Sequence, residues 1–508
     1  MPFFNDATLL ASINLHTAFF PNFKLNARPC PVLYRYLFML KQRIAPFKPT
    51  LSALPEQISD YFRFEQLGTN YRTEWLASLT TFMALAPVLV VNAHILGNAV
   101  FLEQPGDLFE QILVALALCS AAASILVGVL ANYPFALSPG TGTAALFAFS
   151  IVLGMGMNWR LALTAALVQG ILFTGLSLSP FRRQLNNAIP QSLKQAMVVG
   201  LGLFLSCIAL SGKVAPPYFG AGIIVSGTAT TTILGNLKQP ATLIAIAGIL
   251  FTTLLTIRQV KGALSLGIIG TALLGWGCGV APLPQGIFML PRFPHDLMGQ
   301  AIAGIHYLTG SQWGNFIAVV FILLFVSLSD TMSAFSLLGH QMNQLTAEGE
   351  LRRSQPALLA NALGSVFGAL MGSTPAIPYL ISASGIMEGG RSGFVAIAVA
   401  ILFLISTIFT PLFAAVPAFA TTPVLIMIGV MMMRCVRLID WRNLAEAIPA
   451  FLVILIMPLT FSIADGVAAG LIAHAVATVA QKDTQRLRSS LILAGISIAY
   501  FTLITLQT

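Results

Sequence analysis

The stretch Ser138–Thr143 (SPGTGT) interrupts one apolar segment of the chain, and Gly372–Tyr379 (GSTPAIPY) interrupts a second one far downstream. Glycine and proline break or kink helices, so each stretch predicts a broken segment rather than one continuous helix. Short, interrupted segments at matching places in two halves of a membrane protein indicate a binding site between the halves. The two stretches therefore suggest both an architecture and the place of its site.

The composition around these stretches is that of an integral membrane protein. Asp, Glu, Lys and Arg make up 8% of the 508 residues, and hydrophobic residues make up 57%, whereas a soluble domain carries about 25% charged residues. Apolar runs of about 20 residues, the length of one membrane crossing, recur along the chain. They do not alternate with polar residues, which favours helices over the strands of a barrel.

We therefore predict an all-α polytopic membrane protein with about fourteen segments. Seven precede the long connection 281–313 and seven follow it, and in each half the third segment is the broken one. An odd number of helices per half inverts the second repeat relative to the first. The long run 447–480 is interrupted by Pro458, so it is predicted to be either one helix or two short helices. The predicted segments are 76–98, 110–131, 139–156, 160–179, 192–212, 238–257, 262–280, 314–339, 356–371, 378–389, 392–411, 416–433, 447–480 and 488–507.

The charge distribution orients the chain in the membrane. The formal net charge is +9, and the basic residues lie in short loops between apolar runs, as in cytoplasmic loops rather than in a nucleic-acid site. Residues 1–60 form a basic extension without a spanning run, and the loop after the first helix carries Glu103, Asp107 and Glu110. This contrast predicts a cytoplasmic N-terminus, in a cytoplasmic (inner or plasma) membrane.

No motif in the chain indicates an enzyme or a bound cofactor. No nucleotide-binding, zinc-protease or serine-hydrolase motif occurs in a fitting context. The five cysteines are scattered, without metal-ligand spacing. We expect no catalytic residue, no cofactor and no metal. The expected partners are a small-molecule substrate and the lipid bilayer, with a homodimer left open.

Asp330 is the most informative single residue. It lies inside a predicted helix, with no other charge between Asn315 and His340. A carboxylate at bilayer depth costs at least about 2.5 kcal/mol on insertion scales, so it should face a cavity or a partner, or stay protonated. We predict that Asp330 contacts substrate or carries a coupling proton. The alternative is a packing carboxylate capped by Thr331 and Ser333.

The interrupted stretches supply the other candidate groups. Gly140-Thr141-Gly142-Thr143 and Ser373-Thr374-Pro375 are predicted to begin half-helices, whose free N–H groups would point at a ligand. The alternative is a kinked helix packed through small residues. Tyr379 could stack on a planar ring. Asp465 follows the break at Pro458 and is predicted to cap a helix.

Residues from about 61 to 508 resemble the Azg-like adenine/guanine/hypoxanthine permeases, a branch of the xanthine/uracil permease superfamily of nucleobase–cation symporters. The matching stretches lie in order along the membrane part. They are Tyr61–Leu96 (YFRFEQLGTNYRTEWLASLTTFMALAPVLVVNAHIL), Ser138–Met155 (SPGTGTAALFAFSIVLGM), Gly262–Pro282, Ser329–Thr331, Gly389–Gly393 (GGRSG), Val416–Met432 (VPAFATTPVLIMIGVMM) and Ile439–Gly466 (IDWRNLAEAIPAFLVILIMPLTFSIADG).

The resemblance implies a fold of 7+7 segments in inverted repeats, with repeat one over about 72–281 and repeat two over about 314–508. Segments 1–4 and 8–11 would form a core domain and the others a gate domain. The third and tenth segments would each pair a short strand with a half-helix. The substrate would lie between them, near the eighth helix. The substrate-binding set would be Gly140, Thr141, Gly142, Ala145, Asp330, Ser373, Thr374, Pro375, Tyr379 and Ile381, with Asp330 also carrying the coupling proton.

The chain departs from the family pattern inside this pocket. Ile381 stands where the family usually has a Glu that binds the base, Ala144 replaces a usual Asn, and Pro87 replaces a usual Tyr. An apolar residue in place of the Glu leaves a ring N–H without its partner, which disfavours purines. The leading expectation is a secondary active, proton-coupled transporter of nucleobases or related heterocycles, working by alternating access. The alternatives are an anion transporter of the same superfold and a transport-inactive sensor or scaffold.

Overall fold

A computed structural model describes residues 54–179, 191–211, 220–225, 233–284, 286–346 and 351–481, with parts of 490–502. The predicted extension 1–60 therefore lies outside the described residues up to residue 53, as does much of the predicted segment 488–507. From residue 55 onward the chain forms one compact unit. Within the described part, nine helices are long and apolar enough to cross a membrane, which confirms the predicted polytopic helical fold.

The long helices follow the apolar runs of the sequence closely. They are α6 (Tyr71–Gly97), α7 (Phe109–Ala131), α9 (Trp159–Leu178), α11 (Gln191–Leu210), α12 (Pro240–Ile257), α15 (Trp313–Gln341), α18 (Gly393–Ser406), which continues through η5 (Thr407–Phe409) into α19 (Thr410–Ala414), α20 (Ala418–Met433), extended by η6 (Arg434–Leu438), and α22 (Ile463–Gln481).

Shorter elements connect or complete the bundle. They are α4 (Leu54–Phe62), α5 (Phe64–Leu67), β2 (Ile224–Val225), β3 (Ile233–Leu234), α13 (Ala263–Gly277), α14 (Gln300–Ala303), η2 (Gly304–Tyr307), η3 (Gly310–Gln312), α16 (Ser354–Leu370) and α21 (Leu444–Thr460). The run 447–480 is therefore two helices. The hydroxyl of Ser462 accepts the Asp465 N–H at 3.2 Å, so the predicted cap at Asp465 is wrong, because Asp465 lies inside the first turn that Ser462 caps.

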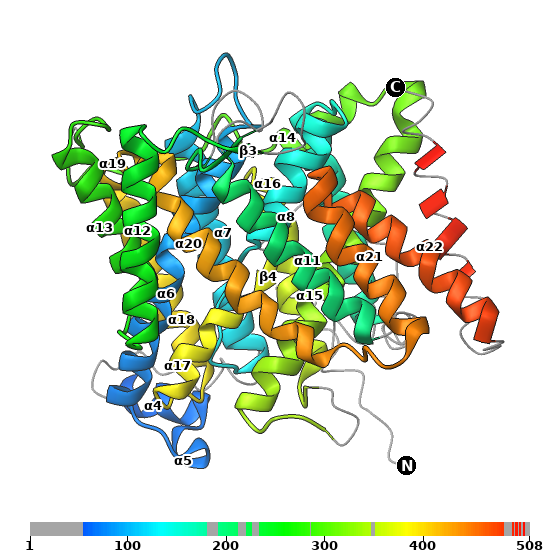
Figure 1. Cartoon of the computed structure of the whole chain (residues 1–508). Helices are drawn as coiled ribbons and strands as arrows, with labels where there is room; N and C mark the ends of the chain where they lie inside the picture. Colours follow the sequence, from blue (N-terminus) through cyan, green and yellow to red (C-terminus); the bar gives the residue numbers. More distant parts are fainter. Residues whose placement is uncertain are drawn as a thin grey trace, which may run out of the picture. The chain divides into compact units, whose positions relative to one another are not determined.

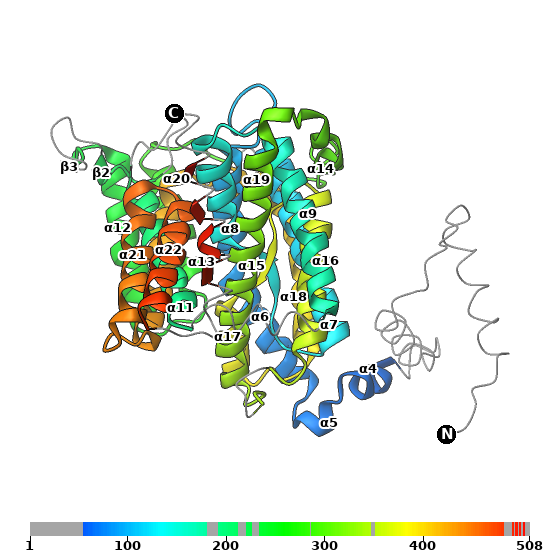
Figure 2. The same cartoon turned by 90° about the vertical axis from the view of Figure 1, so that its right-hand side faces the viewer.

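The helices divide into two packed groups. Helices α6, α7, α9, α15, α16 and α18 contact one another, and α11, α12, α13, α20, α21 and α22 form the second group. Figure 2 shows α12, α21 and α22 on one side of the bundle and α9, α16 and α18 on the other. The groups meet where α6 contacts α13 and α20 and where α11 contacts α15. This grouping matches the helices expected for core and gate domains.

The two broken segments meet in the interior of the bundle. Strand β1 (Leu137–Pro139) pairs antiparallel with β4 (Ala376–Pro378), with Ser138 opposite Ile377. Beyond β1 the chain enters α8 (Thr141–Ala145) and the π-helix η1 (Leu146–Gly154). Beyond β4 it enters the short helices η4 (Leu380–Ser382) and α17 (Ala383–Met387). Figure 1 shows α8 and β4 near the middle of the helices. The predicted strand and half-helix are thus present in both segments.

This sheet has two strands, so each strand has one outer edge without a neighbouring strand, and the residues at these edges fit that position. The flanking bonds, Gly140 N–H to the Pro375 carbonyl at 3.2 Å and Tyr379 N–H to the Ala136 carbonyl at 3.3 Å, show that Pro139 and Pro378 fall at outward-facing positions. Proline lacks an N–H, so it leaves no unpaired donor at such an edge. The prolines that break the helical pattern therefore also fit the strand pair.

Two serines from neighbouring helices satisfy the other outward-facing groups. Ser124 on α7 accepts the Leu137 N–H at 3.0 Å and donates to the Leu137 carbonyl at 2.9 Å. Ser365 on α16 likewise accepts the Ala376 N–H at 3.1 Å, and its hydroxyl hydrogen is shared between the Ala376 carbonyl at 3.3 Å and the Asn361 carbonyl at 3.0 Å. Leu137 and Ala376 are each the first residue of a strand. In both halves, a serine on a neighbouring helix therefore bonds the backbone where the strand begins.

Candidate functional site

The first half-helix begins where the sequence predicted, and its N-terminus is already hydrogen-bonded. Gly140 is the N-cap of α8. The Thr141 N–H donates to the Tyr379 hydroxyl at 2.8 Å, and this hydroxyl donates to the Pro139 carbonyl at 2.9 Å. Asn92 of α6 also donates its amide to the Pro139 carbonyl, at 2.7 Å. Tyr379 therefore joins the second broken segment to the first through its hydroxyl.

Asp330 lies beside this junction. It is 8% exposed, and its helix α15 contacts β4, α8 and η4. Helix α15 also contacts α11 of the second helix group, and Leu337 of α15 packs with Cys435 of η6. The acid therefore lies where the broken segments and the second group approach each other.

Several buried polar atoms around the junction have no hydrogen-bond partner among the described residues. On α15 these are Asp330 Oδ2 and the hydroxyls of Ser329 and Ser333. These three positions fall within about 100° of the helix circumference, so they share one face. Asn92 Oδ1 and Thr374 Oγ1 are also without a partner. Buried polar groups are normally satisfied, so such a set indicates a place for water or a polar ligand.

The second broken segment differs from the prediction at its start. Ser373, Thr374 and Pro375 precede strand β4, and the helical turns begin only at Leu380. The prediction that Ser373-Thr374-Pro375 begins a half-helix is therefore wrong. A strand lies between them and the half-helix because this stretch pairs with the first segment, and the Pro375 carbonyl accepts the Gly140 N–H.

The remaining predicted residues are buried around the strand pair. Gly142 packs against the second helix group, where a Cβ on it would lie 2.3 Å from Leu201 Cδ2 of α11. Ala145 is fully buried in α8, and Ile381 is 8% exposed in η4. Tyr379, whose ring could stack on a planar ligand, also bonds the backbone of the first segment through its hydroxyl.

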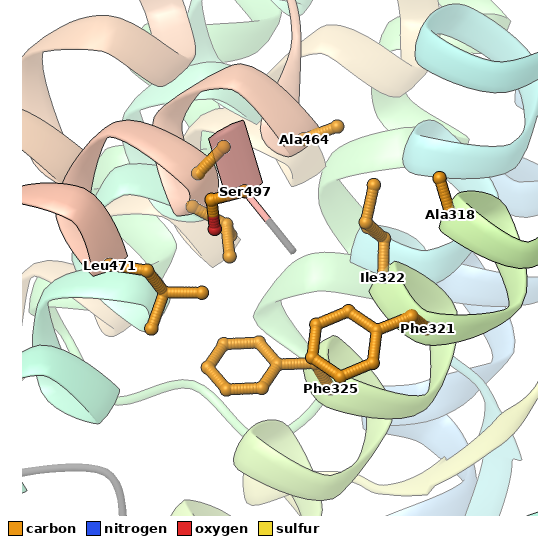
Figure 3. A pocket seen from close by; sticks show the side chains of 9 residues that line it. Ala318, Phe321, Ile322, Phe325, Ala464, Leu471 and Ser497 are labelled. Carbon is orange, nitrogen blue, oxygen red and sulfur yellow. The ribbon is translucent and has the colours of Figure 1, made fainter. Parts of the chain in front are cut away.

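An apolar pocket lies between α15 and α22, away from the polar junction. Figure 3 shows the rings of Phe321 and Phe325 facing Leu471 and Ser497 across it. The two rings are nearly parallel, with centroids 6.2 Å apart. Helix α15 also carries Asp330, so one part of its length lines this pocket and another part lines the polar junction.

Sequence reasoning missed three polar residues of the core group. Glu74 is fully buried, and its carboxylate accepts the Arg391 N–H at 2.9 Å and the Ser392 hydroxyl at 2.5 Å. Asn92 and Asn361 are also fully buried. An amide inside an apolar helical run was the available signal for both asparagines, since such a residue needs partners in hydrocarbon.

These features define a class of protein. Membrane-spanning helices around two broken segments, which meet beside a buried carboxylate, form the architecture of a secondary transporter. The permease family model designated Xan_ur_permease matches residues 72–468. The chain therefore belongs to the xanthine/uracil permease family of membrane transporters.

Individual relatives agree with this family. A protein of Methanocaldococcus jannaschii described as a permease is 42% identical over 83% of this chain and 92% of its own. The guanine/hypoxanthine permease PbuG of Bacillus subtilis is 36% identical over 82% of this chain and 93% of its own. The adenine permease AdeP of Escherichia coli is 32% identical over 84% of this chain and 91% of its own.

Solved structures share the fold at low sequence identity. The transmembrane domain of the cyanobacterial bicarbonate transporter BicA superposes with a TM-score of 0.56 at 13% identity, covering 79% of this chain and 97% of that one. The inward-facing murine anion transporter Slc26a9 gives a TM-score of 0.58 at 12% identity, covering 92% of this chain and 75% of that one. These likenesses concern the fold alone.

Proposed function

We propose that this permease carries nucleobases, or closely related planar heterocycles, across a cytoplasmic membrane, with its N-terminus in the cytoplasm. The relatives named for guanine, hypoxanthine and adenine support this substrate class. The observation that carries the proposal is the cluster of unpartnered polar atoms around Asp330, beside the paired broken segments. A base presents ring N–H and carbonyl groups, which a carboxylate and hydroxyls can pair.

Asp330 takes the central role in this proposal. Its free Oδ2 accepts a ring N–H, and the hydroxyls of Ser329 and Ser333 on the same face of α15 can donate to a ring carbonyl or accept from a second N–H. These groups take over the pairing that the family's Glu provides at position 381. Protonation of Asp330 would couple transport to a proton, since it is the buried acid nearest the junction.

Movement of one helix group past the other gives alternating access in this proposal. The two groups touch at small side chains, as where Gly142 of α8 packs on Leu201 of α11. Polar links between the groups, among them the Ser265 hydroxyl to the Met83 carbonyl, the Ile463 N–H to the Ser150 hydroxyl and the Lys261–Glu388 ion pair, would break or rearrange in this movement. Because Asp330 and the broken segments belong to one group, the substrate site moves with that group and opens to one side at a time.

The test is uptake of radiolabelled guanine, hypoxanthine, adenine and uracil into proteoliposomes, with and without an inward proton gradient. We expect uptake of at least one base, stimulated by the gradient. Asp330→Asn should reduce it at least tenfold, because a hydrogen bond to a charged group contributes about 1.5–3 kcal/mol.

Asp296→Asn is the matched control. Asp296 lies in the connection before α15 and accepts the Gln111 amide at 2.6 Å, so its loss should leave uptake within about twofold. Uptake that is equal in Asp330→Asn and wild type would exclude Asp330 from the mechanism. The absence of flux for every base would instead favour a transport-inactive sensor or scaffold.

A further inference from the structure

We propose that the Tyr379 hydroxyl is a specificity determinant that keeps anions out of the site by occupying the N-terminus of the first half-helix. The inference deepens the proposed function and rests on the same site.

The argument begins with the helical run after the first strand. Helix α8 continues directly into η1, so the apolar helix extends over Thr141–Gly154. The first N–H groups of a helix lack partners within the helix, and together with the helix dipole they attract anions. In this chain the Thr141 N–H is bonded to the Tyr379 hydroxyl at 2.8 Å, and the Thr141 hydroxyl lies 3.0 Å from the same oxygen.

The orientation of the tyrosine is fixed by a second bond. Its hydroxyl donates to the Pro139 carbonyl at 2.9 Å, so its oxygen is left to accept from Thr141. Tyr379 is 7% exposed. A ligand that reached the Thr141 N–H would have to displace a buried phenol with both of these bonds.

At the junction, the unpartnered hydroxyls of Ser329, Ser333 and Thr374 can donate or accept, whereas two other unpartnered side-chain oxygens among the described residues only accept. Asn92 donates its amide nitrogen to the same Pro139 carbonyl, and its Oδ1 has no partner among the described residues. Asp330 Oδ2, on α15, also has no partner within the part of the chain that the structure describes. With the helix N–H used by Tyr379, these oxygens favour ligand N–H groups and repel negative charge. The site thus selects a neutral ring rich in N–H donors.

Removal of the hydroxyl should reverse this preference in part. Tyr379→Phe keeps the ring but frees the Thr141 N–H, which then offers a donor to a negatively charged or acceptor-rich group. The effect should appear in the ratio of affinities for two ligands of one ring system. Suitable probes are hypoxanthine, which is neutral at pH 7, and urate, which is an anion at that pH. Sulfate serves as a small inorganic probe.

Binding to the purified full-length chain in detergent is measured by calorimetry for wild type and Tyr379→Phe. Tyr133→Phe is the matched control, because the buried Tyr133 hydroxyl accepts the Arg353 N–H at 3.0 Å in another part of the core group. We expect the urate-to-hypoxanthine dissociation-constant ratio to fall about tenfold in Tyr379→Phe and to stay within twofold in Tyr133→Phe. An unchanged ratio in Tyr379→Phe, or an equal fall in both variants, overturns the inference.

A second variant covers the case in which Tyr379→Phe does not fold. Asn92→Leu removes a free acceptor while it leaves the tyrosine bonded to Thr141. It should weaken hypoxanthine about tenfold without the gain in sulfate binding expected of Tyr379→Phe, because the Thr141 N–H stays bonded to Tyr379. A gain in sulfate binding in Asn92→Leu would overturn the inference. If wild type binds no base but Tyr379→Phe gains sulfate, the proposed function fails while the role of Tyr379 stands.

Discussion

Replacement of Ser365 by alanine tests whether the strand pair positions the site. The Ser365 hydroxyl is the partner of both the N–H and the carbonyl of Ala376, at 3.1 and 3.3 Å. Ala376 is fully buried, with an exposed fraction of 0%. Each buried group left without a partner costs about 1–3 kcal/mol. Since two such groups are affected, we expect Ser365→Ala to destabilise the protein by about 2–6 kcal/mol.

Ser124→Ala provides an independent repeat of the same experiment. Ser124 makes the equivalent two bonds to Leu137, which is also fully buried. The matched control is Ser336→Ala on α15, because the Ser336 hydroxyl only donates to the Met332 carbonyl of its own helix. That carbonyl keeps its ordinary helical bond, so this change should cost less than about 0.5 kcal/mol.

The assay combines thermal unfolding in detergent with uptake at saturating and limiting base concentrations. Ser365→Ala and Ser124→Ala should lower the unfolding midpoint by several degrees, and Ser336→Ala should not. In the folded fraction, both strand variants should raise the KM for uptake, because β1 and β4 hold Thr141 and Tyr379 in register. Midpoints of the strand variants equal to that of Ser336→Ala would refute the reasoning.

Two further predictions concern contacts between helices. Gly128→Ala should destabilise the protein strongly, because a Cβ would lie 2.6 Å from the Gly393 carbonyl oxygen. Gly175→Ala should be neutral or slightly stabilising, because a Cβ there would meet no described atom within 4 Å. The unfolding midpoints of the two variants are compared. Lys261→Ala removes an ion pair to Glu388, which is 2.8 Å long and solvent-exposed on the lysine side. Its effect on the free energy of unfolding should be under about 1 kcal/mol and should disappear at high salt. A larger effect that is insensitive to salt would contradict this.

The parts of the fold that could be predicted from sequence depend on local chemistry. Apolar runs of spanning length must become helices in lipid, and the Gly-Pro stretches must interrupt them. The start of α8 at Thr141 followed from the glycines around it. These signals need no knowledge of what lies next to them in space, which explains why they predicted the segments closely.

The errors came from contacts between residues far apart in the chain. Ser373-Thr374-Pro375 looks like a helix start, but the stretch pairs with the first broken segment, and this pairing makes the next residues a strand. For Tyr379 the sequence suggested only a ring for stacking, which stays a prediction, and gave no sign of the bonds that its hydroxyl makes to Pro139 and Thr141. Glu74 was overlooked because its partners, Arg391 and Ser392, lie in the other repeat. No local pattern reports such partners.

The two halves of the molecule also differ in how the polar groups near the paired strands find hydrogen-bond partners. Four residues before Ser124, Ser120 bonds the Ser138 hydroxyl at 2.8 Å, so both hydroxyls are satisfied within repeat one. The corresponding positions in repeat two, counted from Ser365 and Ala376, hold Asn361 and Ile377.

Isoleucine cannot bond, so the Asn361 amide donates instead to Thr331 on α15 at 2.8 Å, and its Oδ1 stays unpartnered. Thr331 adjoins Asp330 in the chain. With Ile377 in the place that Ser138 holds in the first strand, Asn361 thus ties α16 to the helix that carries the acid. It follows that the first half mainly shapes the site, while α15 and α16 of the second half supply polar groups that have no partner among the described residues and can bind a ligand.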